Sequence, residues 1–421
     1  MSGSVHVIGA GLAGLSASVA LARRGVRLVL SEAARQAGGR CRSYHDERLG
    51  MAIDNGNHLV LSGNGAVERY VEAIGARSSL TGPDRAEFPF LDLARGRRWT
   101  LRPSEGRLPW WLLDARRRVP DTRLGDYLSL AVLMRRHPGR RLDEVIRCEG
   151  VLWESFLRPL FVSALNTAPE EAAADLAGAV VRETLGRGGR YTRPLLATPT
   201  LAAAFVDPAL GLLARHGAGI RFGRTLRGIG LEAGRVRSLA FDDGEETLGP
   251  DDRVILAVPP WVAPKLLPGL VAPDSFRAIV NAHYRRSAPP GAPAMIGLVG
   301  ATADWVFAFG DRLSVTVSAA DHLVDRDAEE LAPLLWRDVT AALDLPPEEP
   351  PAWRIVKEKR ATFAPTPDQE VRRPAARTAW ANLFLAGDWT ATGLPATIEG
   401  ALRSGEAAAA QVLAPPLARA A

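Results

Sequence analysis

The stretch VHVIGAGLAGL at residues 5–15 decides the fold of this chain. Its first residues are typical of a short buried strand, and the glycines that follow are typical of a turn into a helix. Gly9 is predicted to make the tight turn, Gly11 to let the backbone approach a pyrophosphate, and Gly14 to let the helix pack closely on the sheet. The helix begins near Ala13, so its free amides and positive dipole end would point at the phosphates. The pattern therefore predicts the start of a dinucleotide-binding βαβ unit.

The residues that follow complete this unit. Gly25 is placed to end the helix, and Val26–Leu30 are typical of a second buried strand. Glu32 lies about twenty residues beyond the glycines, where a carboxylate accepts hydrogen bonds from a ribose diol. We therefore expect the turn at Ala10 and the carboxylate of Glu32 to contact one dinucleotide.

A second glycine turn favours FAD over NAD as that dinucleotide. Gly38, Gly39 and Arg40 follow closely after Glu32, where a nicotinamide enzyme would continue its alternating strands and helices. A guanidinium forks onto phosphate oxygens, so Gly39 and Arg40 are predicted to contact the pyrophosphate of FAD. The glycines at 186–190 follow no apolar strand and do not form a second such unit. We therefore expect an external electron donor rather than a bound nicotinamide.

The far end of the chain carries two further segments of this kind. Residues 382–388 read NLFLAGD, a buried strand that ends in a glycine and a carboxylate. Residues 395–401 read PATIEGA and lead into a helix that is expected to end near Gln411. Residues so far from the amino-terminal glycines share one cofactor only if the sheet returns to its start.

Both ends resemble the flavin amine oxidase and phytoene desaturase superfamily. The resemblance implies an α/β fold, with a Rossmann-like FAD-binding domain and an interleaved α+β substrate domain of mixed sheet and helices, as in amine oxidases and the Rab GDP-dissociation inhibitors. It also implies that Gly387 and Asp388 bind the ribityl chain of FAD. By the same resemblance, Thr397 and Ile398 lie beside the isoalloxazine ring, and the backbone near Leu226 meets the adenine.

The length of 421 residues exceeds the usual size of a single core, so two domains are expected. The predicted FAD-binding domain is discontinuous and comprises residues 1–75, 205–275 and 360–421. The predicted substrate domain comprises residues 76–204 and 276–359.

Composition points to a cytoplasmic protein. No apolar run reaches the roughly 18 residues that a membrane-spanning helix needs, and the first strand starts too early to leave room for a signal peptide. Cys41 and Cys148 have no metal or redox spacing, which fits a reducing compartment. Neither lies in the carboxy-terminal flavin segment, so FAD is expected to be non-covalent. The histidines form no metal-binding pattern, and we expect no metal.

The net charge of +5 is unevenly distributed. Trp99, Trp110 and Trp111 lie among arginines in the segment 95–141, which also contains the apolar stretch 127–134. One explanation is a peripheral contact with the inner face of the membrane, with the indole rings at the level of anionic headgroups. The other is an amphipathic helix packed on its own core with a solvated basic rim. Nucleic acid is not expected as a partner, because no binding module surrounds these residues.

Within the superfamily the chain resembles more closely the hydroxysqualene dehydroxylase group, also called squalene-associated desaturases. This resemblance is carried by DNGNHLVLSG at 54–63, LW at 152–153 with PL at 159–160, ALNT at 164–167, VNAH at 280–283 and EKRATF at 358–363. Tyr284 departs from the group's pattern, where a more apolar residue is expected. The resemblance implies that the reduced flavin removes an allylic hydroxyl from a C30 polyprenyl lipid to give squalene, in hopanoid synthesis.

Such a reaction needs a proton donor, a hydride at close range and a dry site. The loop that holds Gly56 and Asn57 is expected to pass the isoalloxazine, which makes His58 the first candidate for the acid because its ordinary pKa is near 6.5. The alternative is a histidine that only bonds to backbone. Asn166 is a candidate for orienting the hydroxyl, and its alternative role is to hold a helix end.

Three rival functions share this fold. An oxidative carotenoid or polyprene desaturase would run the electrons in the opposite direction. A flavin amine oxidase would need an aromatic cage beside the flavin, for which Trp389 has no identifiable partner ring. A non-redox carrier of prenyl lipids would not need the intact glycines, Glu32, Arg40 and Asp388.

Overall fold

The computed structural model describes residues 3–414. Its dinucleotide-binding half is built on a five-stranded parallel sheet in the order β10-β2-β1-β14-β20. The strands are β1 (Val5–Ile8), β2 (Leu28–Ser31), β10 (Gly219–Arg221), β14 (Arg253–Leu256) and β20 (Leu383–Leu385). The sheet therefore returns to its start, as the sequence predicts, because the last strand joins the same sheet as the first.

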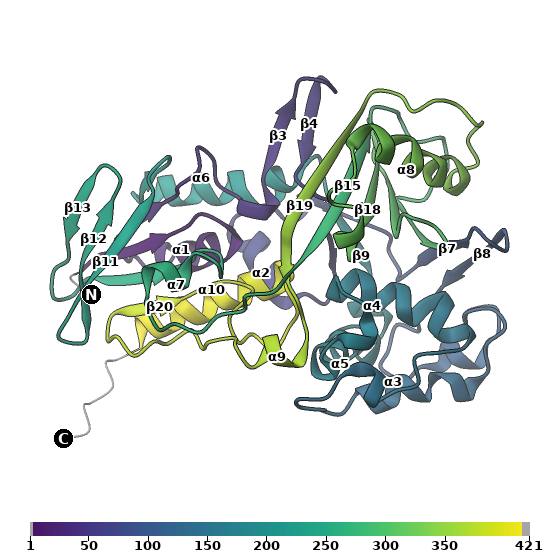
Figure 1. The fold of residues 1–421 in the computed structure, drawn as a ribbon, viewed down its shortest axis with the longest axis horizontal. Coiled ribbons are helices and arrows are strands. Elements are labelled where there is room, and N and C mark those ends of the chain that lie inside the picture. The colour runs from purple at the N-terminus through teal and green to yellow at the C-terminus, as the bar shows by residue number, and fades with distance from the viewer. Residues whose placement is uncertain (1–2, 415–421) are drawn as a thin grey trace.

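Two helices from opposite ends of the sequence pack together on this sheet. They are α1 (Leu12–Ala22) and α10 (Ile398–Leu413), which lie side by side in Figure 1. A Cβ atom on Gly405 would lie 2.3 Å from the carbonyl oxygen of Ala13, so the helices approach more closely than a larger residue permits. Ser16 Oγ also donates to the carbonyl of Leu402 at 2.9 Å. This contact fixes the first turn of α10 next to the glycine turn. The helices α2 (Gly65–Ala73) and α6 (Asp207–Arg215) complete this layer.

The second half contains a seven-stranded mixed sheet in the order β19-β15-β18-β17-β16-β7-β8. Its strands are β7 (Phe88–Asp92), β8 (Arg97–Leu101), β15 (Phe276–Tyr284), β16 (Met295–Val299), β17 (Trp305–Ala308), β18 (Leu313–Val317) and β19 (Trp353–Phe363). A predicted boundary between residues 359 and 360 falls inside β19, which pairs with β15 as far as Phe363. The division into two domains remains a prediction.

Helix α8 (Ala328–Ala342) covers one face of this sheet. Tyr284 belongs to that face, since its hydroxyl donates to the carbonyl of Ala332 at 2.6 Å and its ring lies 4.8 Å from that of Trp336. The departure at Tyr284 therefore lies in the core under α8. Side chains alternate along β15, so Asn281 and His283 point to the opposite face.

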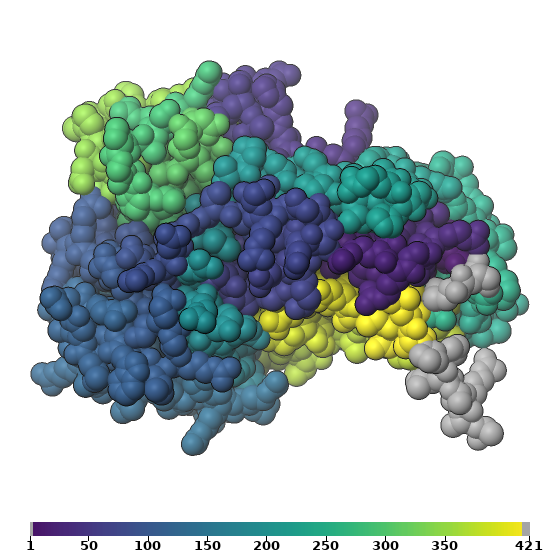
Figure 2. All heavy atoms as spheres, turned by 180° about the vertical axis from the view of Figure 1, so that it is seen from behind, coloured from purple at the N-terminus to yellow at the C-terminus, as the bar shows by residue number. Residues whose placement is uncertain are grey.

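A group of helices stands at one end of the molecule, below the seven-stranded sheet in Figure 1. It comprises the short turn Trp110–Leu113, α3 (Leu128–Leu133), α4 (Arg158–Leu165) and α5 (Ala174–Glu183). The space-filling view in Figure 2 shows residues 100–150 on the outside of this end.

Only one of the three predicted interfacial tryptophans is largely exposed. Trp111 is buried against Tyr127, and Trp99 stacks on Phe90 at 5.5 Å between ring centroids. For Trp99 and Trp111 the structure favours the second explanation, packing on the protein's own core, because both rings have aromatic partners there. Trp110 is 63% exposed. No helix within residues 3–414 is long and apolar enough to cross a bilayer.

Three smaller sheets complete the strand content of residues 3–414. The hairpin β3 (Ser43–Asp46) and β4 (Met51–Asp54) precedes the loop at residues 55–58. Three strands form the second sheet: β5 (Leu59–Leu61), β6 (Leu80–Thr81) and β9 (Pro194–Ala197). The third sheet consists of β11 (Leu226–Glu232), β12 (Arg235–Phe241) and β13 (Gly244–Thr247). The fold is thus the predicted α/β architecture with a parallel sheet and a separate mixed sheet.

Candidate active site

The glycine turn between β1 and α1 is shaped for a close backbone approach. Gly9 has a φ of +105°, and a Cβ atom on it would lie 2.4 Å from the carbonyl oxygen of Ala257. A Cβ atom on Gly14 would lie 1.9 Å from the carbonyl oxygen of Gly9. At Gly11, in contrast, no atom lies within 4 Å of that position. The turn therefore packs tightly against neighbouring backbone at Gly9 and Gly14, whereas the space beside Gly11 is unoccupied by protein atoms.

The predicted ribose-binding acid lies beside this turn. Glu32 accepts hydrogen bonds from the backbone of Ala10 at 2.6 Å and of Ala34 at 2.8 Å. Arg224 N donates to the carbonyl of Glu32 at 2.9 Å, which brings the segment just before Leu226 to the same edge of the sheet. The predicted adenosine-side residues therefore lie close together.

The second glycine turn adjoins the first. Gly38 N donates to the carbonyl of Ala10 at 2.8 Å, and a Cβ atom on Gly39 would meet only the Cα of Gly11, at 3.3 Å. These contacts bring Gly11 and Gly39 together along one open strip of backbone. Such a strip suits a pyrophosphate, which hydrogen-bonds to amides without needing side chains.

Arg40 joins this turn to the carboxy-terminal segment. Its guanidinium donates to Asp388 Oδ1 at 2.7 Å and to the carbonyl of Ala361 at 2.5 Å. Asp388 is buried and follows β20, where Gly387 N donates to Ser404 Oγ at 2.9 Å. The nearby Asp388 carboxylate helps to raise the pKa of Arg40 above its usual value, although burial opposes this shift. The guanidinium of Arg40 therefore remains charged.

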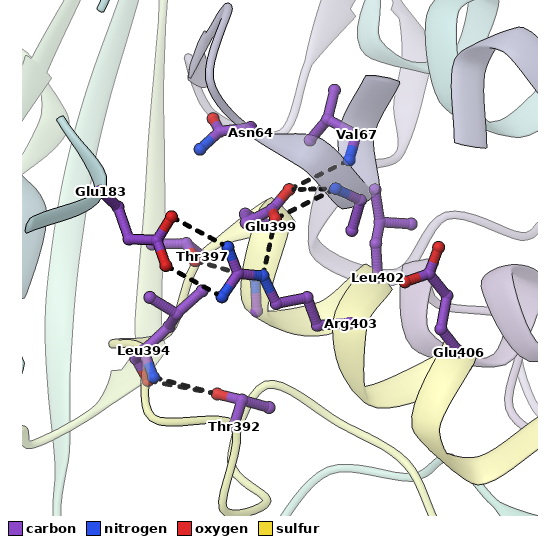
Figure 3. A network of polar contacts seen from close by, with 12 residues as sticks. Asn64, Val67, Glu183, Thr392, Leu394, Thr397, Glu399, Leu402, Arg403 and Glu406 are labelled. Carbon is purple, nitrogen blue, oxygen red and sulfur yellow. Dashed lines mark hydrogen bonds and ion pairs between the residues drawn. The ribbon is translucent and has the colours of Figure 1, made fainter. Parts of the chain in front are cut away.

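The start of α10 is tied to the start of α2 by a buried carboxylate (Figure 3). Thr397 caps α10 by accepting from Gly400 N at 3.0 Å, and Ile398 is buried in the first turn. Glu399 accepts from the backbone of Ala66 and Val67 at 3.0 Å and from Arg403 Nε at 2.7 Å. These bonds fix the segment that the family resemblance places beside the isoalloxazine.

Arg403 extends this network to the helical end of the molecule. Its guanidinium also pairs with Glu183 on α5, with an Arg403 Nη2 to Glu183 Oε2 distance of 3.2 Å (Figure 3). Glu399 lies in the segment PATIEGA, but the sequence alone predicted no role for its side chain. A glutamate in the first turn of a helix indicates a stabilising role at that helix end. The sequence did not show that its partners would lie on α2.

The loop after β4 connects the dinucleotide site to the seven-stranded sheet. Asn57 N donates to Asn281 Oδ1 at 3.3 Å, and a Cβ atom on Gly56 would lie 3.0 Å from Asn281 Nδ2. Asn55 Nδ2 donates to Glu358 Oε2 at 3.2 Å. Sequence reasoning assigned no site role to Asn281 or Glu358.

His58 lies close to Arg40. Burial and the positive charge of Arg40 lower the pKa of His58 to about 4, while the Arg40 backbone acts in the opposite direction. The pKa of His58 therefore differs from the ordinary value near 6.5 on which its choice as the acid was based, because the loop is covered on folding. The imidazole is uncharged at neutral pH.

Asn166 has the geometry of its structural alternative. It ends α4 with a φ of 55°, and its Oδ1 accepts from Ala319 N at 2.7 Å. Its Nδ2 donates to Thr362 Oγ1 at 2.9 Å and to the carbonyl of Arg277 at 3.4 Å. Both amide hydrogens thus form hydrogen bonds within the protein. This favours a structural role for Asn166 at the end of α4 over a contact with substrate.

The two lysines of β19 lie away from the loop. Lys359 pairs with Asp325 at 2.7 Å, and Lys357 donates to the carbonyl of Arg326. Trp389 is buried, with its Nε1 donating to the carbonyl of Val258 at 3.0 Å. In these contacts Lys357, Lys359 and Trp389 bind partners outside the loop 56–58. None of the three contributes to the aromatic cage that a flavin amine oxidase would need there.

The residues present fit FAD. The backbone strip at Gly11 and Gly39 is open on the side where a pyrophosphate would lie, and the carboxylates of Glu32 and Asp388 flank it. A parallel sheet with this glycine turn, an acid after the second strand and a returning carboxy-terminal strand defines a flavin-dependent oxidoreductase.

Comparisons with known proteins agree with this class. Residues 12–413 match the family described as flavin containing amine oxidoreductase. The chain therefore belongs to that family, and it is an FAD-dependent oxidoreductase.

Three relatives of high sequence identity share one name. The chain is 52% identical to the hydroxysqualene dehydroxylase of Rhodopseudomonas palustris, over 98% of this chain and 99% of the relative. It is 51% identical to the protein of that name from Sinorhizobium fredii, over 97% and 98% of the two chains. It is 47% identical to the one from Zymomonas mobilis, over 96% and 97%.

A solved structure supports the fold alone. An oxidoreductase from Methanosarcina mazei has a TM-score of 0.73 at 15% identity, over 96% of this chain and 99% of that one. The superfamily resemblance seen in the sequence is confirmed.

Proposed function

We propose that this enzyme reductively removes the hydroxyl group of hydroxysqualene to give squalene. The observation that carries the proposal is identity of about one half, over nearly the whole length, to three proteins that bear the name hydroxysqualene dehydroxylase. Such similarity extends across both sheets and is therefore not limited to the dinucleotide-binding part.

FAD is held, in this proposal, by backbone and side chains from both ends of the chain. The residues are Gly9, Ala10, Gly11, Ala13, Gly14, Glu32, Gly39, Arg40, Gly56, Asn57, Leu226, Gly387, Asp388, Thr397 and Ile398. The contacts between Ala10 and Glu32 and between Arg40 and Asp388 support this set. The FAD-binding domain would then comprise 1–75, 205–275 and 360–421, and the substrate domain 76–204 and 276–359.

The reaction replaces one bond at an allylic carbon. The C–O bond breaks, the oxygen leaves with an added proton as water, and a C–H bond forms at the same carbon. FAD, when bound and reduced, supplies the hydride. An external reductant must then restore the two electrons, and we assign no donor within the chain.

His58 is the proposed proton donor. Its lowered pKa makes the protonated ring a stronger acid than free histidine, although few molecules carry that proton at neutral pH. A ring nitrogen of His58 would pass the proton to the leaving oxygen. The neighbouring positive charge of Arg40 favours the uncharged ring that is left after that transfer.

The experiment that tests the function compares two redox states of the holoprotein under anaerobic conditions. The reduced protein mixed with hydroxysqualene should yield squalene as the flavin is reoxidised. The oxidised protein mixed with squalene should show no bleaching of the flavin. Bleaching in the second arm without squalene in the first would instead identify an oxidative desaturase.

We also propose that the substrate reaches the enzyme from an anionic bilayer. Trp110, Leu113 and Leu128 are 63%, 67% and 68% exposed. Leu124, Leu128 and Val132 follow at intervals of four residues, which places them on one side of their helical segment. The ring contact between Trp111 and Tyr127 holds this segment next to the turn that carries Trp110.

Charge supports the same assignment. Residues 102–136 contain eight arginines and four acidic residues. Arg107, Arg123, Arg135 and Arg136 are exposed, and none of them forms an ion pair within the described residues 3–414. Exposed apolar groups with unpaired cations nearby suit anionic headgroups above an acyl layer.

A vesicle experiment tests this surface. We expect the triple serine variant of Trp110, Leu113 and Leu128 to bind phosphatidylglycerol vesicles about 100-fold more weakly, at about 1 kcal/mol for each side chain removed. A matched control replaces Val271 and Val371, which are 58% and 80% exposed elsewhere on the surface. Equal losses in both variants would show that the surface has no special role.

A further inference from the structure

One row of paired residues crosses the seven-stranded sheet on the face opposite α8. Asn281 on β15 pairs with Thr316 on β18, and Thr316 pairs with Trp305 on β17. Trp305 pairs with Gly297, Gly297 with Phe90, and Phe90 with Trp99. Directly paired residues share a face, and six strands at about 4.8 Å spacing make a row of about 24 Å.

The row is polar at one end only. Asn281 is 1% exposed, and its Oδ1 accepts from Thr316 Oγ1 at 2.8 Å and from Asn57 N at 3.3 Å. Its Nδ2 donates to no acceptor within the part of the chain that the structure describes, and it lies next to Gly56. On a residue that is 1% exposed, an amide donor without a protein partner is uncommon and leaves a hydrogen bond for a ligand.

A spare acceptor lies in the same cluster. Asn57 Nδ2 donates to Thr316 Oγ1 and to the carbonyl of Val315, each at 3.2 Å. Asn57 Oδ1 is buried and has no partner among the described residues. The cluster of Asn57, Asn281 and Thr316 thus has one unused donor and one unused acceptor, which are the two bonds that an alcohol can satisfy.

The rest of the row is aromatic. Phe90 lies 5.5 Å from both Trp305 and Trp99 between ring centroids. Gly297 separates Phe90 from Trp305 in the row, and a Cβ atom there would lie 2.5 Å from the Phe90 ring. The missing side chain therefore lets the rings form a continuous apolar surface.

We propose that Asn281 recognises the substrate hydroxyl by donating a hydrogen bond from Nδ2 to its oxygen, while Trp305, Phe90 and Trp99 contact the hydrocarbon chain. This inference rests on the proposed function, because it concerns the substrate of the same site. The polar end of the row touches the loop 56–57, and the aromatic end touches the helical group that carries Trp110.

The arrangement explains how substrate is distinguished from product. Squalene has no hydroxyl, so its binding would leave the Asn281 donor unpaired and buried. An unpaired buried donor costs about 1–3 kcal/mol, which corresponds to a preference of roughly 5- to 150-fold for the alcohol. The product is then released more easily than the substrate.

The test measures dissociation constants of hydroxysqualene and squalene on the oxidised holoprotein, which lacks the electrons for turnover. Perturbation of the flavin absorbance reports binding. We expect roughly 5- to 150-fold tighter binding of hydroxysqualene in the parent protein, in line with the cost of an unpaired donor. Asn281→Asp keeps the Oδ1 acceptor for Thr316 and Asn57 and removes the donor, so it should lose this preference with little change for squalene.

Two further variants separate the hydrogen bond of Asn281 from the effects of charge and of hydrocarbon contact. Asn281→Leu removes the donor without adding a charge and should behave like Asn281→Asp. Trp305→Leu also loses the hydrogen bond from Trp305 Nε1 to Ser163 Oγ, but it should weaken both ligands by the same factor, because its proposed contact with either ligand is hydrocarbon. If the parent protein prefers hydroxysqualene and both Asn281 variants keep that preference, the assignment of Asn281 is wrong. If the parent protein binds both ligands equally, the assignment of Asn281 is wrong while the proposed function stands. If hydroxysqualene does not bind at all, the proposed substrate is wrong as well.

Discussion

Replacing Glu399 by glutamine tests whether the buried carboxylate of Figure 3 holds the start of α10 in place. Glu399 accepts two backbone hydrogen bonds from the first turn of α2 and one from Arg403. Its side chain is 5% exposed, whereas that of Glu406 on the same helix is 33% exposed and pairs with Arg69 alone among residues 3–414. Glu406→Gln is therefore a matched control.

The magnitude follows from these contacts. A glutamine retains one acceptor oxygen and turns an amide group toward a second donor, so about two charge-assisted bonds are lost. At about 1.5 kcal/mol each, we expect Glu399→Gln to lower the free energy of unfolding by about 3 kcal/mol. The exposed pair of Glu406 should contribute at most about 1 kcal/mol.

Thermal unfolding of the flavin-free protein measures this difference. An unfolding entropy of about 2.1 cal/mol/K per residue gives close to 1 °C per kcal/mol for a chain of this length. We therefore expect a fall in Tm of about 3 °C for Glu399→Gln and about 1 °C or less for Glu406→Gln. If the fall in Tm for Glu399→Gln is no larger than that of the control, Glu399 does not hold the start of α10 in place.

Further predictions concern pH and the glycine turn. Burial lowers the pKa of His58 to about 4 and, with the charge of Arg312, that of His283 to about 3. The unfolded chain takes up these protons near pH 6.5 and the folded chain does not, so stability should fall by up to about 1.4 kcal/mol per pH unit for each histidine below that pH. Chemical unfolding at pH 7 and pH 5 measures this slope, and His283→Asn should reduce it. If protonated His58 is the acid, kcat/KM should rise about tenfold per unit from pH 7 to 5.5, and His58→Asn should remove the rise. Gly11→Ala should keep the Tm of the flavin-free protein but lose most of the yellow flavin, since its Cβ enters only open space, whereas Gly14→Ala should lower the Tm. Equal Tm values for the two glycine variants would contradict the packing described at Gly14.

Local geometry was the part of the fold that the sequence could predict. A glycine with positive φ and a glycine facing a carbonyl oxygen are requirements of the chain itself, so Gly9 and Gly14 follow from spacing alone. The strand at 383–385 could be placed in the same sheet because a shared cofactor requires it.

Contacts between distant segments were not predictable. Asn281 lies in a strand that reads as apolar, and its unused donor appears only when Thr316 and Asn57 are brought to it. Trp99 and Trp111 look like surface residues because arginines surround them in sequence, yet their rings pack on Phe90 and Tyr127. The pKa of His58 depends on burial and on Arg40, neither of which the sequence states.

A single turnover in deuterated water tests the central claim most directly. The reduced holoprotein, mixed anaerobically with hydroxysqualene, should form one squalene for each flavin reoxidised. Because the hydride of a reduced flavin exchanges with solvent, each squalene should carry one deuterium at the carbon that bore the hydroxyl. Squalene without deuterium, or reoxidation of the flavin without squalene, would contradict reductive removal of the hydroxyl at this site.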